Sequence, residues 1–313
     1  MNQLRVAVIG AGSFGRHHVR VIKEMPDVEL TAIVDPNIEG AHKNIEDVIG
    51  RIDAAIVATP TVTHESIATQ LLESGIDVLV EKPVAQTSEG AERLARLAQK
   101  NGRILQAGHL ERFNPAVTAL EKALTIPLFF EVHRLSVFTP RSLDIDVVLD
   151  LMIHDLDIVL SFVGAMPEEI RAAGISVLSS KVDIANVRLA FASGCIANLT
   201  ASRISADQVR KLRLFQPGEY VSLDYHRQDA VRLAIRKNEA KIGFESLAVS
   251  PAEPLALELA AFFGCVRDRG APRVDAFQAA KALRVAESIL AKIKVHADLV
   301  SNTIRSQSNF PGG

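Results

Sequence analysis

The sequence has few of the features that mark secreted, membrane or nucleic-acid-binding proteins. Its two cysteines, Cys195 and Cys265, are far apart and lack metal-ligand spacing, so we expect no disulfide framework, no metal site and a reducing, cytoplasmic setting. No apolar run reaches the roughly 20 residues that a membrane span needs, and no signal-peptide pattern precedes the first apolar run. The 35 basic and 37 acidic residues form no basic block and no acidic tail, which argues against nucleic-acid binding and against disorder.

The composition that remains is typical of a globular protein with more than one core. Of the 313 residues, 48% are hydrophobic and 23% are charged. This length is too great for one small core, so we predict two domains, residues 1–118 and residues 119–313, with the final helices packing back on the first.

A glycine-rich turn lies near the start, in the stretch RVAVIGAGSFG from Arg5 to Gly15. Its apolar run suits a strand buried on both faces of a parallel sheet, and the glycines have G-x-G-x-x-G spacing. Gly10 permits a tight turn, Gly12 lets the backbone approach a pyrophosphate, and Gly15 lets the next helix pack closely. An ordinary strand–helix turn could have the same glycines, so the motif alone leaves both interpretations open.

A second apolar run ends at Asp35, 20 residues after Gly15. A carboxylate there can accept hydrogen bonds from both hydroxyls of an adenosine ribose, and it would repel the 2′-phosphate of NADP. Together with the glycine turn, Asp35 predicts a dinucleotide site that takes NAD.

The order of strands and helices changes along the chain. The first third alternates them, which predicts an α/β fold with a parallel, doubly wound sheet. After about residue 125, strands follow one another, which predicts an open, mostly antiparallel sheet whose uncovered face forms a subunit interface unless loops cover it. Strands are predicted at residues 4–9, 28–34, 54–58, 77–80, 104–107, 128–138, 170–178, 182–191, 195–204, 211–215, 220–225, 230–235 and 241–247. Helices are predicted at residues 13–23, 64–73, 87–100, 114–124, 147–163, 254–269 and 275–294.

Lys82 follows a predicted strand within Glu81-Lys82-Pro83. Ligands of open α/β sheets lie beyond the carboxyl ends of the strands, so Lys82 is expected at the mouth of the cofactor cleft. A solvated loop lysine is the alternative, but Pro83 stiffens the turn and removes a competing N–H donor.

The stretch DVVLDLMIHDLDIVLSFVG, residues 146–164, predicts a helix on which Asp150 and His154 lie one turn apart. One interpretation is an amphipathic helix whose polar stripe faces water. The rest of the helix is so apolar that it is expected to cross the domain core instead. There the carboxylate would orient the imidazole and tune its pKa for proton transfer.

Two polar loops supply further candidates. The loop from Ala58 to His64 follows one strand, with Thr63 also suited to cap a helix, and the loop from Gly108 to Pro115 follows another. The candidate cofactor-binding residues are Gly10, Gly12, Ser13, Phe14, Gly15, Asp35, Thr59, Pro60, Thr61, His64, Glu81, Lys82 and Arg112. The candidate substrate-binding residues are Lys82, His109, Glu111, Arg134, Arg141, Asp150 and His154.

The chain resembles the Gfo/Idh/MocA oxidoreductases over nearly its whole length. The resemblance lies in VIGAGSFGRHH, IVATPTVTHESIA, VLVEKPVA, QAGHLERFNP, LDLMIHDLDIV and EPLALELAAFFGCV, in that order. It implies an N-terminal Rossmann domain, a C-terminal α+β domain with an open sheet, and dimers or tetramers. It also implies that Lys82 is catalytic, that His154 is the acid/base and that Asp150 is its partner near the substrate. The segment between Asp35 and Asp53 departs from the family, because it is shorter and leaves room for one modest helix around residues 45–49.

Within that family, the runs HLERFNPA, HRLSVFTPR, KVDIANVRL and GCIANLTASRIS look like the branch that oxidises the 3-hydroxyl of UDP-N-acetylglucosamine. In that branch, the 3-keto sugar goes to an aminotransferase that makes a 3-amino sugar for lipid A. A UDP-sugar needs cations for its diphosphate, and the candidates are Arg134, Arg141, Arg203, Lys211 and Arg213, unless these are solvated strand charges.

Two other functions stay open at this point. The substrate could be inositol, a free sugar or a sugar acid, with the same chemistry. The chain could also be an NAD-binding sensor without activity, although such a protein has no need to keep Lys82, Asp150 and His154 together.

Overall fold

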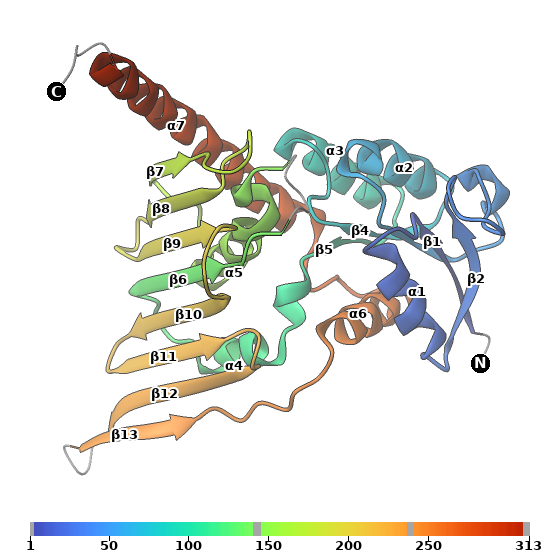
Figure 1. The fold of residues 1–313 in the computed structure, drawn as a ribbon. Helices are drawn as coiled ribbons and strands as arrows, with labels where there is room; N and C mark the ends of the chain where they lie inside the picture. Colours follow the sequence, from blue (N-terminus) through green and yellow to red (C-terminus); the bar gives the residue numbers. More distant parts are fainter. Residues whose placement is uncertain (1–2, 140–144, 237–240, 309–313) are drawn as a thin grey trace. The chain divides into compact units, whose positions relative to one another are not determined.

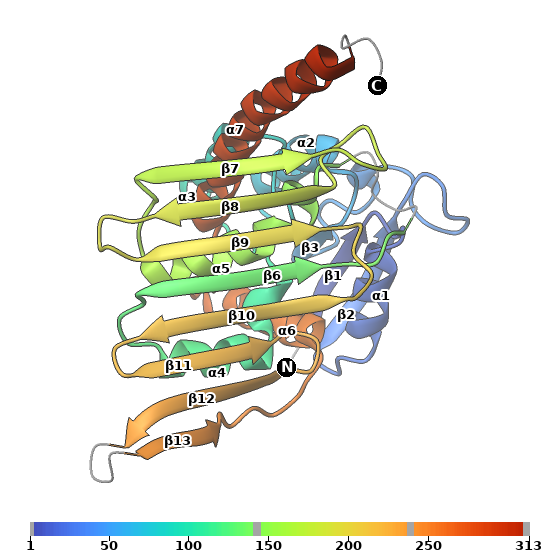
Figure 2. The same cartoon turned by 60° about the vertical axis from the view of Figure 1, so that its left-hand side comes forward.

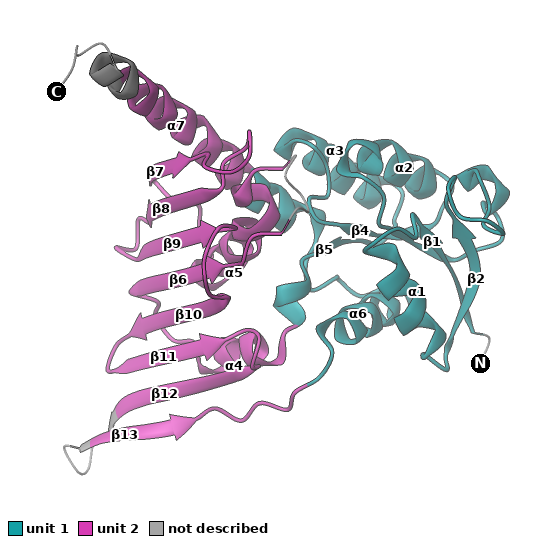
Figure 3. Ribbon diagram, viewed as in Figure 1, with its two compact units in different colours: residues 1–113, 252–283 teal, residues 114–251, 284–313 magenta. Residues whose placement is uncertain are grey.

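The computed structural model describes residues 3–139, 145–236 and 241–308. The chain forms two compact units, each built from two stretches of sequence: residues 1–113 with 252–283, and residues 114–251 with 284–313 (Figure 3). The domain boundary expected after residue 118 stays a prediction. In the structure, the first unit ends at Phe113 and also includes residues 252–283.

The first unit is built on a five-stranded parallel sheet in the order β2-β1-β3-β4-β5 (Figure 1). Its central strands are short runs of valine, alanine, isoleucine and leucine that are buried on both faces, as the sequence predicts for a parallel sheet. The strands are β1 Leu4–Ile9, β2 Val28–Val34, β3 Ala54–Val57, β4 Asp77–Glu81 and β5 Leu105–Gly108.

Helices cover both faces of this sheet, which confirms the doubly wound prediction. Val6 and Val8 point into one hydrophobic cluster, formed with α1 and α6, whereas Ala7 and Ile9 point into the other, formed with α2, α3 and the first turns of α7. The helices are α1 Gly15–Lys23, α2 Thr61–Glu73, α3 Ser88–Lys100, α6 Pro254–Asp268 and α7 Ala276–Ser308. Phe262 of α6 is fully buried, so a segment distant in sequence completes this core.

The second unit is built on an eight-stranded sheet in the order β13-β12-β11-β10-β6-β9-β8-β7. Neighbouring strands are antiparallel except β6 and β9, which are parallel, so the prediction of a mostly antiparallel sheet is confirmed. The strands are β6 Phe129–Leu135, β7 Glu169–Ile175, β8 Ile184–Ala190, β9 Ile196–Ser202, β10 Val209–Gln216, β11 Glu219–Asp224, β12 Asp229–Arg236 and β13 Lys241–Ser246.

The two faces of the eight-stranded sheet differ. Burial alternates along β6, β8 and β9, because one face packs under α4 (Pro115–Ala123) and α5 (Ile153–Val163), as Figure 2 shows. On the other face, Phe215 of β10 is 40% exposed. This outer face is the one expected to bind another subunit.

Three helices differ from the sequence predictions. The second helix begins at Thr61 rather than residue 64, so Thr63 lies in its first turn, where its backbone N–H donates to the Pro60 carbonyl at 2.9 Å. The last helix ends at Ser308 rather than residue 294, because residues 295–308 contain no proline or glycine to stop it. Residues Val148–Met152 form a π-helix rather than an α-helix.

Candidate functional site

The glycine turn at the end of β1 has the geometry that the sequence predicts. Gly10 has φ of 84°, and a Cβ added to it would lie 2.7 Å from Thr59 Cγ2. A Cβ on Gly15 would lie 1.8 Å from the Gly10 carbonyl oxygen, so α1 packs tightly against the turn. A Cβ on Gly12 would have nothing within 4 Å, which leaves the backbone there open to a ligand, with Phe14 52% exposed beside it in the sequence.

Asp35 lies just after β2 and is 7% exposed. Its Oδ2 accepts a hydrogen bond from the Ala11 backbone N–H at 2.9 Å, and its Oδ1 accepts one from the Asn37 N–H at 2.8 Å. A carboxylate has about four lone-pair sites, so these two bonds hold it against the glycine turn and leave capacity for ribose hydroxyls. In the short segment that follows, the only helix is a 3₁₀ turn, Ile45–Asp47.

His64 joins the loops that follow β3 and β4. The ring is 1% exposed; its Nε2 lies 2.7 Å from the Thr59 carbonyl oxygen and its Nδ1 lies 2.8 Å from the Pro83 carbonyl oxygen. Thr59 also accepts a hydrogen bond from the Thr63 hydroxyl at 2.8 Å. Pro60 and Thr61, the other candidates of this loop, start α2.

Lys82 follows β4 and is half-buried, and its peptide bond to Pro83 is cis. The neighbouring Glu81 carboxylate is 8% exposed. Its Oε1 lies 2.7 Å from Nε2 of the fully buried His18, and its Oε2 accepts a hydrogen bond from the Lys82 backbone N–H at 3.3 Å. Sequence reasoning missed His18, although its position three residues after Gly15 places it on the inner face of α1.

The loop after β5 carries three candidates on or beside a short 3₁₀ helix, Leu110–Phe113. His109 is 1% exposed and Arg112 is 4% exposed, whereas Glu111 is half-buried. The Arg112 carbonyl accepts a hydrogen bond from Arg273 Nε at 3.0 Å. Two of these three side chains are therefore buried.

In the second unit, Asp150 lies in the π-helix and His154 lies in the first turn of α5. The π-helix is closed by the Ile153 N–H, which donates to the Val148 carbonyl five residues earlier. Such wide turns are rare and frequently occur at functional sites. Both side chains are half-buried, and Asp157 farther along is only 3% exposed, so the polar stripe of this helix is partly enclosed.

A buried ion pair anchors α5 to the sheet. Arg134 Nε donates to Asp155 Oδ2 at 2.7 Å and Nη2 donates to Oδ1 at 2.9 Å, with both residues at most 3% exposed. The guanidinium also lies 4.8 Å from the centroid of the Tyr225 ring. Arg134, a candidate for binding the substrate diphosphate, therefore has its guanidinium paired with Asp155, the residue next to His154 in the sequence.

Asp183 organises the turn that meets the start of the π-helix. It is fully buried and accepts hydrogen bonds from the Ser179 hydroxyl and from the backbone N–H groups of residues 177–179. Burial acts to raise the pKa of Asp183, but these hydrogen bonds outweigh it and lower the pKa to about 2. The next residue back, Val182, bonds through its N–H to Asp146 Oδ1 at 2.9 Å and through its carbonyl to the Val147 N–H at 3.0 Å.

The other candidate cations also have partners in the second unit. Arg203 lies 3.7 Å from Asp183 and donates to the Ile145 carbonyl. Lys211 lies 3.9 Å from Asp224, and Arg213 Nη1 lies 3.4 Å from His133 Nδ1; their register positions on β10 place both on the outer face of the sheet. Arg141 lies outside the described residues.

Glu258 is a buried acid that sequence reasoning also missed. It lies on α6, is fully buried, and neither carboxyl oxygen has a hydrogen-bond partner among the described residues. Burial raises the pKa of Glu258 well above its ordinary value, and the charge of Glu81 raises it further. Its signal in the sequence was an acid inside the apolar run LALELAAFF.

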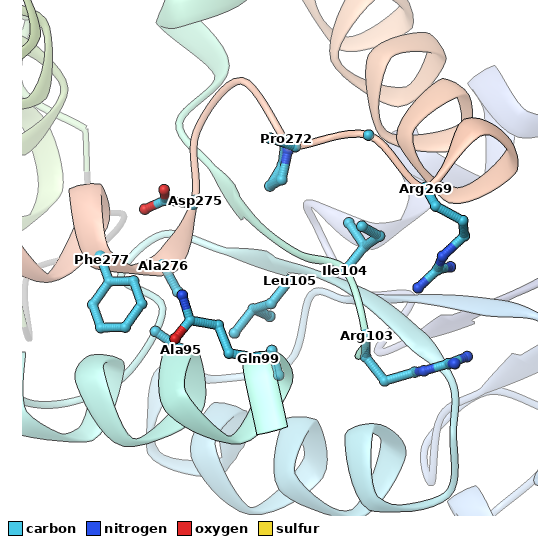
Figure 4. Close-up of a pocket in the computed structure, with 13 residues that line it drawn as sticks. Ala95, Gln99, Arg103, Ile104, Leu105, Arg269, Pro272, Asp275, Ala276 and Phe277 are labelled. Atoms are coloured by element: carbon cyan, nitrogen blue, oxygen red, sulfur yellow. The ribbon is translucent and has the colours of Figure 1, made fainter. Parts of the chain in front are cut away.

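A cavity of about 360 Å³ in the first unit lies apart from these residues. Figure 4 shows it between α3, β5 and the segment that joins α6 to α7, with Gln99, Arg103, Arg269 and Phe277 in its wall. None of the described candidate residues lines it, so it does not belong to the candidate site. Within the described ranges, no cluster of three or more histidine, cysteine or acidic side chains could hold a metal ion, and no helix has the length and apolarity to cross a bilayer.

Comparison with known protein families identifies both parts of the chain. Residues 4–109 match the model described as the oxidoreductase family with an NAD-binding Rossmann fold. Residues 131–215 match the model of the GFO/IDH/MocA C-terminal domain.

Individual proteins are similar over most of the chain. A UDP-N-acetylglucosamine 3-dehydrogenase of Acidithiobacillus ferrooxidans is 36% identical over 237 residues, 72% of this chain and 75% of the relative. A solved structure of UDP-N-acetylglucosamine 3-dehydrogenase GnnA from the same species has a TM-score of 0.89 at 29% identity, covering 95% of this chain and 99% of that one. The NAD(+)-dependent scyllo-inositol 2-dehydrogenase of Bacillus subtilis is 25% identical over 318 residues, 91% of this chain and 92% of the relative.

Proposed function

This chain belongs to the Gfo/Idh/MocA family of NAD-dependent oxidoreductases, and from that membership we propose that it oxidises the 3-hydroxyl of UDP-N-acetylglucosamine to a ketone. The observation that supports this choice of substrate is the 36% identity to the Acidithiobacillus ferrooxidans enzyme. The 3-keto sugar would then be consumed by an aminotransferase.

The first unit fits NAD. Gly12 leaves its backbone open for a pyrophosphate, and Asp35 is held beside the same turn with lone pairs for the ribose hydroxyls. Because that carboxylate repels a 2′-phosphate, steady-state kinetics with the two cofactors should give a higher kcat/KM for NAD than for NADP. A preference for NADP would contradict this role of Asp35.

The proposed reaction uses one side chain of the first unit and two of the second. When bound, NAD supplies the hydride acceptor. His154 takes the proton of the sugar hydroxyl, and the ammonium of Lys82 stabilises the alkoxide that develops. Asp150, in the π-helix, orients the imidazole of His154 and stabilises its protonated form.

The diphosphate of the substrate calls for a cation. Arg134 and Arg203 are buried against acids of the second unit. Of the remaining candidates from the sequence, we propose to test Arg141 first. In the Arg141→Ala variant, KM for UDP-N-acetylglucosamine should rise while KM for NAD stays unchanged. A rise in both would contradict this assignment.

The substrate is tested by the rate of NADH formation with a panel of alcohols. UDP-N-acetylglucosamine should give the highest kcat/KM, above myo-inositol, scyllo-inositol, N-acetylglucosamine and gluconate. The similarity to the Bacillus subtilis scyllo-inositol dehydrogenase supports inositol as the second candidate. Turnover of scyllo-inositol but not of the UDP-sugar would establish that alternative, and NAD binding without turnover of any of these compounds would favour the sensor.

We also propose that the outer face of the eight-stranded sheet binds a second copy of this chain. Ile196, Phe129, Phe215 and Tyr220 occupy paired register positions on four adjacent strands, with ring centroids 5.8 Å apart for Phe129–Phe215 and 5.0 Å apart for Phe215–Tyr220. Phe215 is exposed and the other three are half-buried, and a partly exposed apolar row of this kind is a liability in a monomer. Light scattering should give a dimer or tetramer for the wild type and a smaller species for Phe215→Arg; a monomeric wild type would contradict the proposal.

A further inference from the structure

Two buried histidines contact the residues on either side of Lys82. His18 comes from α1 and His64 comes from α2. His18 reaches Glu81 and His64 reaches Pro83, the two chain neighbours of Lys82. The proposed reaction gives neither ring a chemical step, so their position needs another explanation.

His64 acts as a rigid spacer between two loops. Its Nδ1 lies 2.8 Å from the Pro83 carbonyl oxygen and its Nε2 lies 2.7 Å from the Thr59 carbonyl oxygen, and both of these partners can only accept hydrogen bonds. The loop after β4 is therefore tied through one ring to the loop after β3.

His18 fixes the other side of Lys82 through Glu81. The ring Nε2–H donates to Glu81 Oε1 at 2.7 Å, and Glu81 Oε2 accepts from the Lys82 backbone N–H at 3.3 Å. Strand β5 restricts Glu81 as well, since a Cβ added to Gly108 would lie 3.0 Å from Glu81 Cα and 3.1 Å from its Oε2. The Glu81 side chain has little room to move.

We propose that His18 and His64 are positioning residues for Lys82, and that together they hold residues 81–83 so that the amine is presented in one place at the end of β4. The inference rests on the proposed function, in which the Lys82 ammonium stabilises the alkoxide. A displacement of about 1 Å at a catalytic group can lower the rate about 100-fold, so restraint on both neighbours of Lys82 matters for turnover.

Two substitutions of His64 separate its two hydrogen bonds. His64→Asn places an amide nitrogen near the position of Nδ1 and retains the donor to Pro83, whereas His64→Gln places it near Nε2 and retains the donor to Thr59. We expect His64→Gln to lower kcat about 10- to 100-fold. His64→Asn should keep most of kcat and raise KM for NAD instead. Equal kcat values, or a lower kcat for His64→Asn, would overturn the role of His64.

His18 is tested by removal and by conservative rescue. His18→Leu keeps an apolar side chain but no donor, and it should lower kcat about 10- to 100-fold with NADH affinity retained. His18→Gln keeps a donor near Nε2 and should restore most of kcat, which a role in packing alone would not predict. The exposed His226→Leu serves as the control and should match the wild type. Should His18→Leu fail to fold, the polar pair of His64 variants decides the proposal.

A chemical readout tests the positioning without turnover. In the protein without NAD, the rate at which acetic anhydride modifies Lys82 is measured by peptide mass spectrometry, with the exposed Lys100 as internal reference. His64→Gln and His18→Leu should raise the Lys82-to-Lys100 ratio, because the amine leaves its fixed surroundings. Unchanged ratios together with wild-type kcat in both variants would overturn the proposal.

Lys82→Ala distinguishes this inference from the proposed function. If Lys82→Ala keeps its turnover of UDP-N-acetylglucosamine, the proposed mechanism fails, whatever the modification rates are. If Lys82→Ala is inactive while the histidine variants turn over like the wild type, only the positioning role fails.

Discussion

The two units hold their candidate site residues in different ways. In the first unit, Asp35 and His64 bond to backbone groups of turns that follow parallel strands. In the second unit, Asp150 and His154 belong to a helix that is anchored by charged side chains, foremost the buried Arg134–Asp155 pair. The comparison teaches that the candidate residues of the first unit are held by backbone groups that the sheet topology places. The proposed catalytic residues of the second unit depend instead on a few charged side chains.

The largest expected effect separates chemistry from cofactor binding. Lys82→Ala and His154→Ala should each lower kcat about 100- to 10,000-fold, because in the proposed reaction each residue acts on the hydroxyl or its alkoxide. NADH binding, followed by its fluorescence, should persist in His154→Ala, since the glycine turn and Asp35 belong to the first unit. Near wild-type turnover in either variant would refute the catalytic assignment of that residue.

The buried ion pair gives the next largest effect. Arg134→Met should lower the free energy of unfolding by about 3–5 kcal/mol, because it leaves the Asp155 carboxylate buried without its cation. The double variant Arg134→Met/Asp155→Leu should recover much of that loss. The exposed Arg93–Glu65 pair of the first unit is the control, and Arg93→Met should change stability by at most about 1 kcal/mol. If urea unfolding gave the same loss of unfolding free energy for Arg134→Met and Arg93→Met, the buried pair would contribute no more than the exposed one, which would contradict this prediction.

Asp183→Asn should have an intermediate, pH-dependent effect. The folded protein holds the pKa of Asp183 at about 2, below the ordinary 3.8, so its charge stabilises the fold above pH 3.8 and this contribution disappears as the pH falls towards 2. At pH 7 the variant should lose about 2 kcal/mol of unfolding free energy. Unfolding curves at several pH values measure this, with the exposed Asp207→Asn as the control. A loss that persists unchanged at pH 2 would point to packing rather than charge.

Glu258→Gln should change the unfolding free energy least at low pH, and at higher pH it should stabilise the protein, in contrast to Asp183→Asn. Because the pKa of Glu258 is raised by burial and by Glu81, the wild type loses stability as the pH rises from about 4.5 towards that raised pKa. At pH 5 the two proteins should agree within about 1 kcal/mol. Above that pH, the unfolding free energy of the variant should rise relative to that of the wild type by up to about 1.4 kcal/mol per pH unit. For the control, Glu89→Gln at an exposed position, the difference in unfolding free energy from the wild type should not change with pH. The same pH independence for Glu258→Gln would show that Glu258 is ionised in the folded wild type.

The same contrast explains how far the sequence could predict the structure. The strands of the first unit and the close packing at Gly15 could be predicted from short stretches of sequence. Each of these strands is an apolar run whose side chains enter the hydrophobic clusters on the two faces of the sheet. Helical periodicity placed Asp150 and His154 one turn apart but could not show the π-helix, which inserts no distinctive residue. The sequence shows the charge of Arg134 but not its partner, so Asp155 could not be foreseen as the group that binds it. The role of His64 as a link between two loops depends on the spacing of β3 and β4, which no single stretch contains.

The position of α6 in the first unit has a consequence for biosynthesis. Phe262 and Phe263 close the hydrophobic cluster over Val6 and Val8, yet the 138 residues between positions 113 and 252 belong to the second unit. At synthesis rates of about 5–20 residues per second, the ribosome needs roughly 7 to 28 s to reach α6 after finishing β5 and its loop. Throughout that interval the nascent nucleotide-binding half displays an uncovered apolar surface, which is the kind of surface that chaperones recognise. A ribosome stalled before residue 254 therefore carries a half-built fold that requires protection.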